Sequence, residues 1–292
     1  MTSKSGFLTF TLFTFITLIL SLLPHTLANA MPLKVVELNT WGVPYVVKDT
    51  FRYAEAMKAI EDIHPDFVVL EELFSHKGKK AFHSENYPYE VRGPRAFPRL
   101  TSSGLRILSK YPVLRSAQTT FSHCVGDDCL SHKGAVIMLA QLPNGKTINV
   151  LATHTNSRGD DSVRISQLNQ IKLLIDTYAD PNAPLIMAGD FNFGPQSASY
   201  QYMMESIQGK DTWLETHSAS EPGITYDAFK NSYAHDYCIS THDNMIVDRI
   251  DFIIYRSSDV AQIKPISSSV IFNQAPLFSD HYGLEANFEI AD

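Results

Sequence analysis

The fold of this 292-residue chain is indicated most clearly around residues 185–192, which read Leu185-Ile186-Met187-Ala188-Gly189-Asp190-Phe191-Asn192. The apolar run predicts a short buried strand, and Gly-Asp-x-Asn predicts a sharp turn with polar side chains where the strand ends. An Asx-type turn would by itself account for Asp190 and Asn192. Whether these residues also form a site depends on what lies at the ends of the other strands.

Further runs rich in Val, Ile and Leu predict strands over residues 33–39, 66–71, 104–109, 135–142, 147–153, 250–255 and 284–290, besides 185–188. Apolar residues at helical spacing predict two amphipathic helices, one from Phe51 through Ala54 and Met57 to Ile60, and one from Leu168 to Tyr178 after Ser162. Pro143-Asn144-Gly145 joins two of the strands as a hairpin. The pattern therefore favours an α/β fold with mixed sheets covered by helices.

Composition limits the class of protein. The chain has 24 Lys+Arg against 31 Asp+Glu, a formal net charge of −7, and 44% hydrophobic residues. This is typical of a globular domain and disfavours a scaffold that binds nucleic acid by broad phosphate neutralisation. Without repeats or a linker-like charge run, residues 31–292 are expected to form one domain.

The first thirty residues predict a targeting segment. Lys4 is the only charge before Lys34, the apolar run from Phe7 to Leu23 follows, and Ala28-Asn29-Ala30 supplies small residues around a cleavage site. These features are typical of a secretory signal peptide over residues 1–30, and predict a secreted mature chain. The alternative is an uncleaved anchor, but 17 residues are short for a bilayer span. No later stretch predicts a transmembrane segment.

Export also bears on the three cysteines. Under oxidising conditions the neighbouring Cys124 and Cys129 could close a small disulfide loop, although spacing alone does not establish the bridge. Cys238 would then be left over, and a free buried thiol is expected there.

Most of the expected strands carry, at one end, a residue able to bind a metal or move a proton. These residues are Asn39, Glu71 and Glu72, His154, Asp190 and Asn192, Asp251, and Asp280 and His281. Singly, each has a plain explanation: a turn former, a solvated acidic pair or a structural histidine. Six strand ends of this kind together indicate a site, because ligand crevices form where strands end in α/β sheets.

The chemistry of these side chains points to a hard divalent cation. Carboxylate and amide oxygens with two imidazoles and no cysteine suit Mg²⁺ or Mn²⁺ better than structural zinc. Magnesium is commonly held by one or two carboxylates together with substrate phosphate. The residues therefore predict phosphate-ester chemistry.

At this point the sequence resembles a known family, the endonuclease/exonuclease/phosphatase superfamily of Mg²⁺-dependent phosphoesterases, and within it the neutral sphingomyelinases. The resemblance rests on Leu38-Asn39-Thr40-Trp41-Gly42-Val43-Pro44-Tyr45, Val69-Leu70-Glu71-Glu72-Leu73-Phe74, Ser103-Gly104-Leu105-Arg106-Ile107-Leu108-Ser109-Lys110-Tyr111-Pro112, Lys133-Gly134-Ala135, Thr153-His154, Gly189-Asp190-Phe191-Asn192, Arg249-Ile250-Asp251-Phe252 and Ser279-Asp280-His281. It implies a DNase-I-like four-layer α/β sandwich, with two mixed β-sheets packed face to face and helices outside. It also implies hydrolysis of sphingomyelin, or of a choline phospholipid, at a membrane surface.

The resemblance assigns roles by position. Glu72, rather than Glu71, would be the principal metal ligand, with Asn39 beside it, and Mn²⁺ or Co²⁺ could substitute for Mg²⁺. His281 would be the catalytic base and Asp251 would orient it. His154 would stabilise the phosphate or protonate the leaving ceramide oxygen.

The remaining positions have less specific roles. Asp190 and Asn192, two apart and expected to face one side of an extended segment, would hold the water and phosphate or a second cation. Asp280 would assist the metal or orient its neighbours. Asp190 is an alternative to His281 as the base, and Lys133 is expected near the cleft with no derived role.

Three other functions remain open from the sequence. A phospholipase C acting on phosphatidylcholine or its lyso form would share the phosphocholine head group. A secreted nuclease of the same superfamily is disfavoured by the negative charge, although a local basic groove can exist on an acidic protein. A non-catalytic binding module is the least favoured, because every catalytic position is filled.

Overall fold

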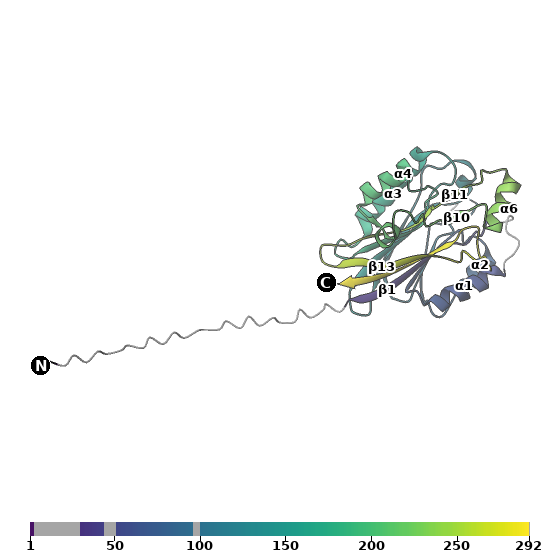
Figure 1. Ribbon diagram of the computed structural model, residues 1–292. Helices are drawn as coiled ribbons and strands as arrows, with labels where there is room; N and C mark the ends of the chain where they lie inside the picture. The colour runs from purple at the N-terminus through teal and green to yellow at the C-terminus, as the bar shows by residue number, and fades with distance from the viewer. Residues whose placement is uncertain (3–29, 44–50, 96–99, 292) are drawn as a thin grey trace.

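The computed structural model describes residues 1–2, 30–43, 51–95 and 100–291 (Figure 1). The predicted signal peptide falls almost entirely on residues 3–29, outside the described residues, and Tyr45 of the first motif also lies outside them. Among the described residues, no helix combines the length and the apolar character that crossing a membrane requires.

The first sheet has six strands, and the first strand of the chain lies inside it. Their order across the sheet is β13 (Gln262–Ile271), β14 (Gly283–Ala291), β1 (Met31–Asn39), β2 (Phe67–Glu71), β4 (Arg106–Ser109) and β3 (Tyr89–Arg92). The strands β1 and β2 run parallel, and all other neighbours in this sheet are antiparallel. The sheet is therefore mixed, as predicted.

The second sheet repeats this arrangement. Its order is β5 (Val113–Thr120), β6 (Gly134–Gln141), β7 (Thr147–His154), β8 (Leu185–Asp190), β12 (Asp251–Arg256) and β9 (Lys210–Asp211). Only β7 and β8 are parallel, and the predicted hairpin joins β6 to β7. A separate two-stranded ribbon consists of β10 (Tyr226–Asp227) and β11 (Val247–Asp248).

The two sheets pack face to face over an apolar core to which Val35, Val69, Ile186, Ile253 and Phe288 contribute. Figure 1 shows helices on the two outer sides of this sandwich. The helices α1 (Arg52–Ile63) and α2 (His76–Ala81) lie on the side of the first sheet, and α3 (Asp161–Tyr178) and α4 (Ala198–Ile207) lie on the side of the second. The predicted four-layer α/β sandwich is confirmed. Both faces of the central strands are covered, which is why these strands read as continuous apolar runs.

The described residues also include the short 3₁₀ helix η1 (Gly126–Leu130), α5 (Thr212–Thr216) and α6 (Ser232–Thr241).

The first predicted helix is confirmed, and two of the four residues predicted for its apolar face, Met57 and Ile60, are buried. The other two, Phe51 and Ala54, are exposed, and Tyr53 and Ala56 belong to the buried face instead. Phe51 is the residue before the first helical turn, so its side chain is not part of the buried stripe. In the second predicted helix, Asp160 caps the N-terminus by accepting from the backbone N–H of Ser162, and the terminal Tyr178 is exposed.

Candidate active site

The two sheets bring their polar strand ends to one place. In the strand registers, Asn39 pairs with Glu71, His154 pairs with Asp190, and Asp190 pairs with Asp251. The parallel pairs β1/β2 and β7/β8 end at this edge, while the antiparallel β12 begins there. The predicted convergence of segments distant in the sequence therefore occurs.

A cavity of about 300 Å³ lies over these strand ends. Six of the candidate residues line it: Glu72, His154, Asp190, Asn192, Asp280 and His281. Asn39 and Asp251 are completely or almost completely buried behind it, where they contact Asp190 and His281. All eight candidate site residues are thus part of one cluster.

His281 and Asp251 form a hydrogen-bonded pair. Nδ1 of His281 lies 2.9 Å from Oδ2 and 3.1 Å from Oδ1 of Asp251, and Nε2 lies 3.8 Å from Oδ2 of Asp190. Burial lowers the pKa of His281, but the carboxylates of Asp251 and Asp190 outweigh burial and raise it well above its usual value. The pairing fixes the orientation of the imidazole ring and leaves Nε2 on the side of the cavity.

Asp190 lies at the centre of the cluster. Its Oδ2 accepts from Nδ2 of Asn39 at 3.0 Å and lies 3.3 Å from Nε2 of His154. Burial would raise the pKa of Asp190, but the neighbouring His154 and His281 hold it well below its usual range. The structure therefore stabilises the carboxylate form of Asp190.

The turn and the site at Asp190 coexist. Oδ1 of Asp190 accepts from the backbone N–H of Asn192 at 2.9 Å, which is an Asx-type turn, and both side chains still line the cavity. The expected extended geometry was wrong, because Asn192 adopts a left-handed conformation with φ 53°. Gly189 precedes this turn at φ 150°, and a Cβ there would lie 2.0 Å from the carbonyl oxygen of Thr153.

Of the two adjacent glutamates, Glu72 lines the cavity and Glu71 points between the sheets. Glu71 is completely buried, so a solvated pair does not exist. Glu72 has φ 52°, and Gly42 lies so close to it that a Cβ would be 2.2 Å from the carbonyl oxygen of Glu72. Left-handed conformations of non-glycine residues are costly and concentrate at functional sites.

The donor set of the cluster fits a hard divalent cation. Oε2 of Glu72 is buried and has no hydrogen-bond partner among the described residues, and Oε1 lies 4.0 Å from Nε2 of His154. Ligand atoms of Asp190, Asp251 and His281 also lie within 4.8 Å of one another. Because Asp251 and His281 already bind each other, we regard Glu72 and Asp190 as the oxygens available to an ion.

Lys133, which was expected near the cleft, contacts the cluster directly. Its Nζ lies 2.8 Å from Nε2 of His154, 2.8 Å from the carbonyl oxygen of Thr155 and 2.7 Å from Oδ1 of Asp128. Burial would raise the pKa of Asp128, but Lys133 outweighs it and holds that pKa below its usual value. A buried lysine therefore links His154 to a carboxylate on η1.

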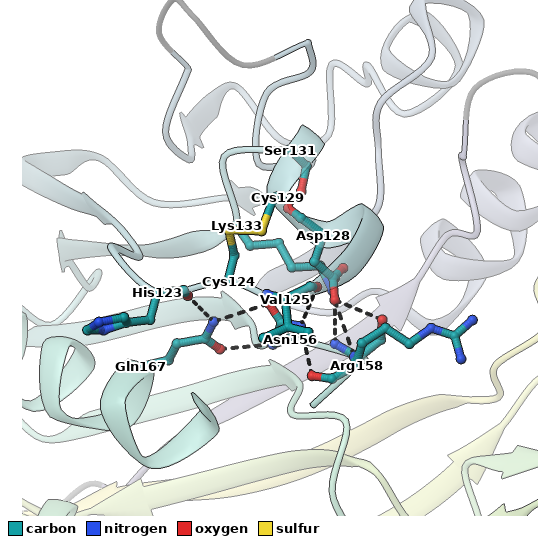
Figure 2. Close-up of a disulfide and its surroundings, with 11 residues drawn as sticks. His123, Cys124, Val125, Asp128, Cys129, Ser131, Lys133, Asn156, Arg158 and Gln167 are labelled. Atoms are coloured by element: carbon teal, nitrogen blue, oxygen red, sulfur yellow. Dashed lines mark hydrogen bonds and ion pairs between the residues drawn. A yellow bond between two sulfur atoms is a disulfide. The ribbon is translucent and has the colours of Figure 1, made fainter. Parts of the chain in front are cut away.

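The segment that carries Asp128 is closed by the disulfide between Cys124 and Cys129, which confirms that pairing (Figure 2). The other oxygen of Asp128 accepts from the backbone N–H and the hydroxyl of Ser157, at 2.7 and 2.8 Å. Cys238 is free and buried, as expected. Asp128 belongs to no strand end, so no signal in the sequence identified it.

Aromatic side chains form part of the cavity wall. Trp41 and Tyr237 both line it, with ring centroids 6.5 Å apart in an edge-to-face arrangement. Trp41 has φ 46° and donates its backbone N–H to Oδ1 of Asn39. At the same cavity, Arg158 and Asp243 form a bidentate ion pair at 2.5 and 2.7 Å.

Comparison with known proteins agrees with this geometry. Residues 36–281 match the model of the family described as the Endonuclease/Exonuclease/phosphatase family. A protein of Mycobacterium tuberculosis named Sphingomyelinase is 28% identical over 228 residues, which are 77% of this chain and 42% of that protein. The chain thus spans about two fifths of the length of the mycobacterial relatives it matches.

Solved structures share the fold. The beta toxin of Staphylococcus aureus, in a structure with bound magnesium ions, has a TM-score of 0.73 at 22% identity, covering 88% of this chain and 99% of that one. A TDP2 structure from D. rerio, complexed with a single-strand DNA product, has a TM-score of 0.70 at 18% identity, covering 88% and 98%. At these identities the likeness extends to the fold alone.

Proposed function

The chain belongs to the endonuclease/exonuclease/phosphatase family, and from this premise we propose that it is a phosphodiesterase that hydrolyses sphingomyelin to ceramide and phosphocholine. One observation carries the proposal. The imidazole of His281, held by Asp251, faces the same cavity as Asp190, His154 and Glu72. Such a cavity combines a base, a side chain able to carry positive charge and oxygen ligands around the space for one phosphate group.

His281 is the proposed base. Its Nε2 would accept a proton from the attacking water while Nδ1–H remains bonded to Asp251, whose carboxylate stabilises the imidazolium that forms. Because the neighbouring carboxylates raise the pKa of His281, this role requires the bound cation, whose positive charge would oppose them. The alternative base, Asp190, is less suited because its pKa is held low and Oδ2 already accepts from Asn39. Asp190 would instead orient the water or bind the cation.

His154 and Lys133 would act on the phosphate. The new bond forms between the water oxygen and phosphorus, and the bond from phosphorus to the ceramide oxygen breaks. The departing oxygen takes up a proton, which His154 would donate from Nε2, while the Lys133 ammonium 2.8 Å from that nitrogen would add positive charge. Asn192, beside them at the cavity, would donate from its amide to a phosphate oxygen.

Glu72 would be the principal ligand of the divalent cation, with Asn39, Asp190 and Asp280 nearby. The unpartnered buried Oε2 of Glu72 supports this choice, and hard oxygen donors favour Mg²⁺, with Mn²⁺ or Co²⁺ as substitutes. When bound, such a cation supplies positive charge to a phosphate oxygen and to the water that attacks phosphorus.

The cavity wall favours a cationic head group. Trp41 and Tyr237 offer aromatic faces or edges, while the charge of Asp243 at the same cavity is paired with Arg158. Quaternary ammonium groups are bound by aromatic side chains in this way. A choline phospholipid therefore fits this wall better than a polyanionic nucleic acid does. Phosphatidylcholine and its lyso form remain the second candidate substrates, since they present the same head group.

We also propose that residues 1–30 are a signal peptide and that residues 31–292 are secreted as one catalytic domain. The disulfide between Cys124 and Cys129 supports export, since such bonds persist mainly outside the cytosol.

A side-by-side assay tests the proposal. The mature chain is incubated with sphingomyelin, phosphatidylcholine, lyso-phosphatidylcholine and single-stranded DNA, with Mg²⁺ and with chelator. We expect phosphocholine from sphingomyelin, dependent on the cation. Cleavage of DNA alone would assign the chain to the nucleases, and no turnover of any substrate would favour a binding module.

A further inference from the structure

A second cavity, of about 630 Å³, lies on the first sheet's side of the molecule and shares no lining residue with the catalytic cavity. It is bordered by α2, by β3 and β4, and by the segment around Leu100. Phe74, two residues after Glu72, also lines it. The second cavity therefore begins just beyond the Glu72 segment but is separate from the proposed reaction site.

Positive charge is concentrated in this cavity. Its lining includes five Lys and Arg side chains but one carboxylate, Glu90; the five are Lys79, Lys80, Arg92, Arg95 and Arg106. We call these five residues the basic cluster. The whole chain has a net charge of −7, so the cluster departs from the average character of the protein.

One carboxylate does not neutralise the basic cluster. Glu90 forms an ion pair with Arg92, and its Oε1 also lies 3.4 Å from Nε of Arg106. Within the described part of the chain, Lys79, Lys80 and Arg95 have no acidic partner within ion-pair distance.

Two of the five charges are removed from solvent, since Arg106 is buried and Lys79 is half-buried, whereas Lys80, Arg92 and Arg95 are exposed. Arg106 is only 3% exposed and donates from Nη1 to the carbonyl oxygen of Lys79 at 3.1 Å, which fixes α2 over it. Burial, together with Arg106, Arg95 and Arg92, lowers the pKa of Lys79. Crowding of like charges in a concave, partly desolvated site costs free energy, which a bound anion offsets.

The rim of the cavity adds an apolar contact. Leu100 lines the cavity and is 79% exposed. An exposed leucine beside lysines and arginines is the combination that binds the head-group region of anionic bilayers, where the cations meet phosphates and the apolar side chain enters the lipid boundary.

We propose that the basic cluster binds a phosphate-bearing anion, carried either by an anionic lipid head group or by a soluble phosphate compound. Multiple phosphate oxygens would be bound by Arg92, Arg95 and Arg106 through their planar donor groups, and by the ammonium groups of Lys79 and Lys80. The inference does not depend on the proposed hydrolysis, because the two cavities share no residue.

Binding to vesicles without turnover tests the inference. The full mature chain, in chelator, is sedimented with phosphatidylcholine vesicles and with phosphatidylcholine vesicles containing phosphatidic acid. We expect at least about tenfold tighter binding to the acidic vesicles, and about a tenfold loss in the double variant Lys79→Gln/Lys80→Gln. The contact from Arg106 to the backbone of Lys79 survives in that variant, so the fold is expected to persist.

The matched control removes the same charge elsewhere. Lys58→Gln/Lys172→Gln changes two exposed lysines that pair with Asp62 and Asp176 on their own helices. This control is expected to bind acidic vesicles like the unchanged chain. If both double variants lost the same amount of binding to acidic vesicles, the loss would be explained by net charge alone, and the proposed site would be rejected.

Competition identifies the source of the phosphate. Release of the vesicles by inorganic pyrophosphate supports a cavity open to soluble phosphates, whereas undiminished vesicle binding supports the lipid head group. If neither probe binds, or if single-stranded DNA binds in preference to both, the proposal fails. Hydrolysis of sphingomyelin in neutral detergent micelles should be unchanged in Lys79→Gln/Lys80→Gln. Absence of hydrolysis in the unchanged chain would reject the proposed function without affecting the binding result.

Discussion

Nζ of Lys133 lies 2.8 Å from Nε2 of His154. An ammonium group has only donors. Lys133 therefore places a positive charge and N–H donors beside His154 at the cavity. A further contact, with Asp128, holds the lysine in place from the side of the disulfide loop (Figure 2).

The first prediction concerns this lysine. Lys133→Met keeps the length of the side chain but removes the charge and the donor, so we expect kcat on sphingomyelin to fall at least about tenfold. KM should change less, because the lost charge acts mainly on the departing oxygen. Steady-state kinetics measure both values. Lys172→Met, on the exposed face of α3, is the control, and equal rates in the two variants would contradict a role for Lys133.

The second prediction separates the two candidate bases. His281→Ala is expected to lose at least about 10²-fold in kcat, because general base catalysis supplies that much or more. Imidazole added to the solution should restore part of the rate, since the space left beside Asp251 accepts a ring that Asp251 can orient.

Asp190→Asn is the matched comparison. It should also be slow, but imidazole should leave it unchanged. Absence of rescue in His281→Ala would contradict the assignment of His281 as the base. Circular dichroism of both variants checks that the fold is retained.

The third prediction tests the cation site without measuring activity. A ligand that binds only the folded state raises Tm, and the rise increases with its concentration above Kd. We expect Mg²⁺ to raise the Tm of the chelator-treated chain, and Glu72→Gln to remove most of this shift, because a neutral amide binds the cation poorly. Glu90→Gln, in the other cavity, should keep the shift. A full shift in Glu72→Gln would exclude Glu72 as the principal ligand.

The sequence predicts the site residues that lie directly at the end of an apolar run and can bind a metal or move a proton. Apolar runs locate the strands, and parallel or antiparallel pairing then forces their polar ends to one edge, as the register of His154 with Asp190 and of Asp190 with Asp251 shows. The sandwich follows from strands that are apolar on both faces.

Other features depend on contacts that no local pattern encodes. The strand β13 was not predicted, since a register shift between Pro265 and Ser267 interrupts its alternation. The polar β5, at the edge of its sheet, lacks the apolar run of a central strand. Asp128 meets Lys133 only through the tertiary fold, and Glu37, buried in β1 beside the cluster, resembles in sequence any exposed strand residue.

The fourth prediction concerns the disulfide. A bond between Cys124 and Cys129 closes a very short loop, which corresponds to about 2 kcal/mol of stabilisation through the unfolded chain. Cys124→Ser/Cys129→Ser should therefore lower the free energy of unfolding by about that amount in denaturant titration. Cys238→Ser, which removes the free buried thiol, is the comparison without a cross-link. Unchanged stability in the double variant would mean that the loop is held by its other contacts, including those of Asp128 to Ser157.

The fifth prediction is a pH dependence of the metal-free protein. Burial, opposed by His281 and assisted by Glu72, raises the pKa of Asp280 to about 7, whereas an aspartate in an unfolded chain has a pKa of about 3.9. Between these values the folded state binds more protons than the unfolded state, so Asp280 makes stability fall as pH rises through this interval and level off above it. Asp280→Asn lacks this titration. In chelator, the difference between the Tm of Asp280→Asn and the Tm of the unchanged chain should therefore shift in favour of the variant as pH rises from about 5 to about 8. Asp176→Asn, on the exposed side of α3, should track the unchanged chain across the same range, and a constant difference for Asp280→Asn would show that Asp280 does not titrate there.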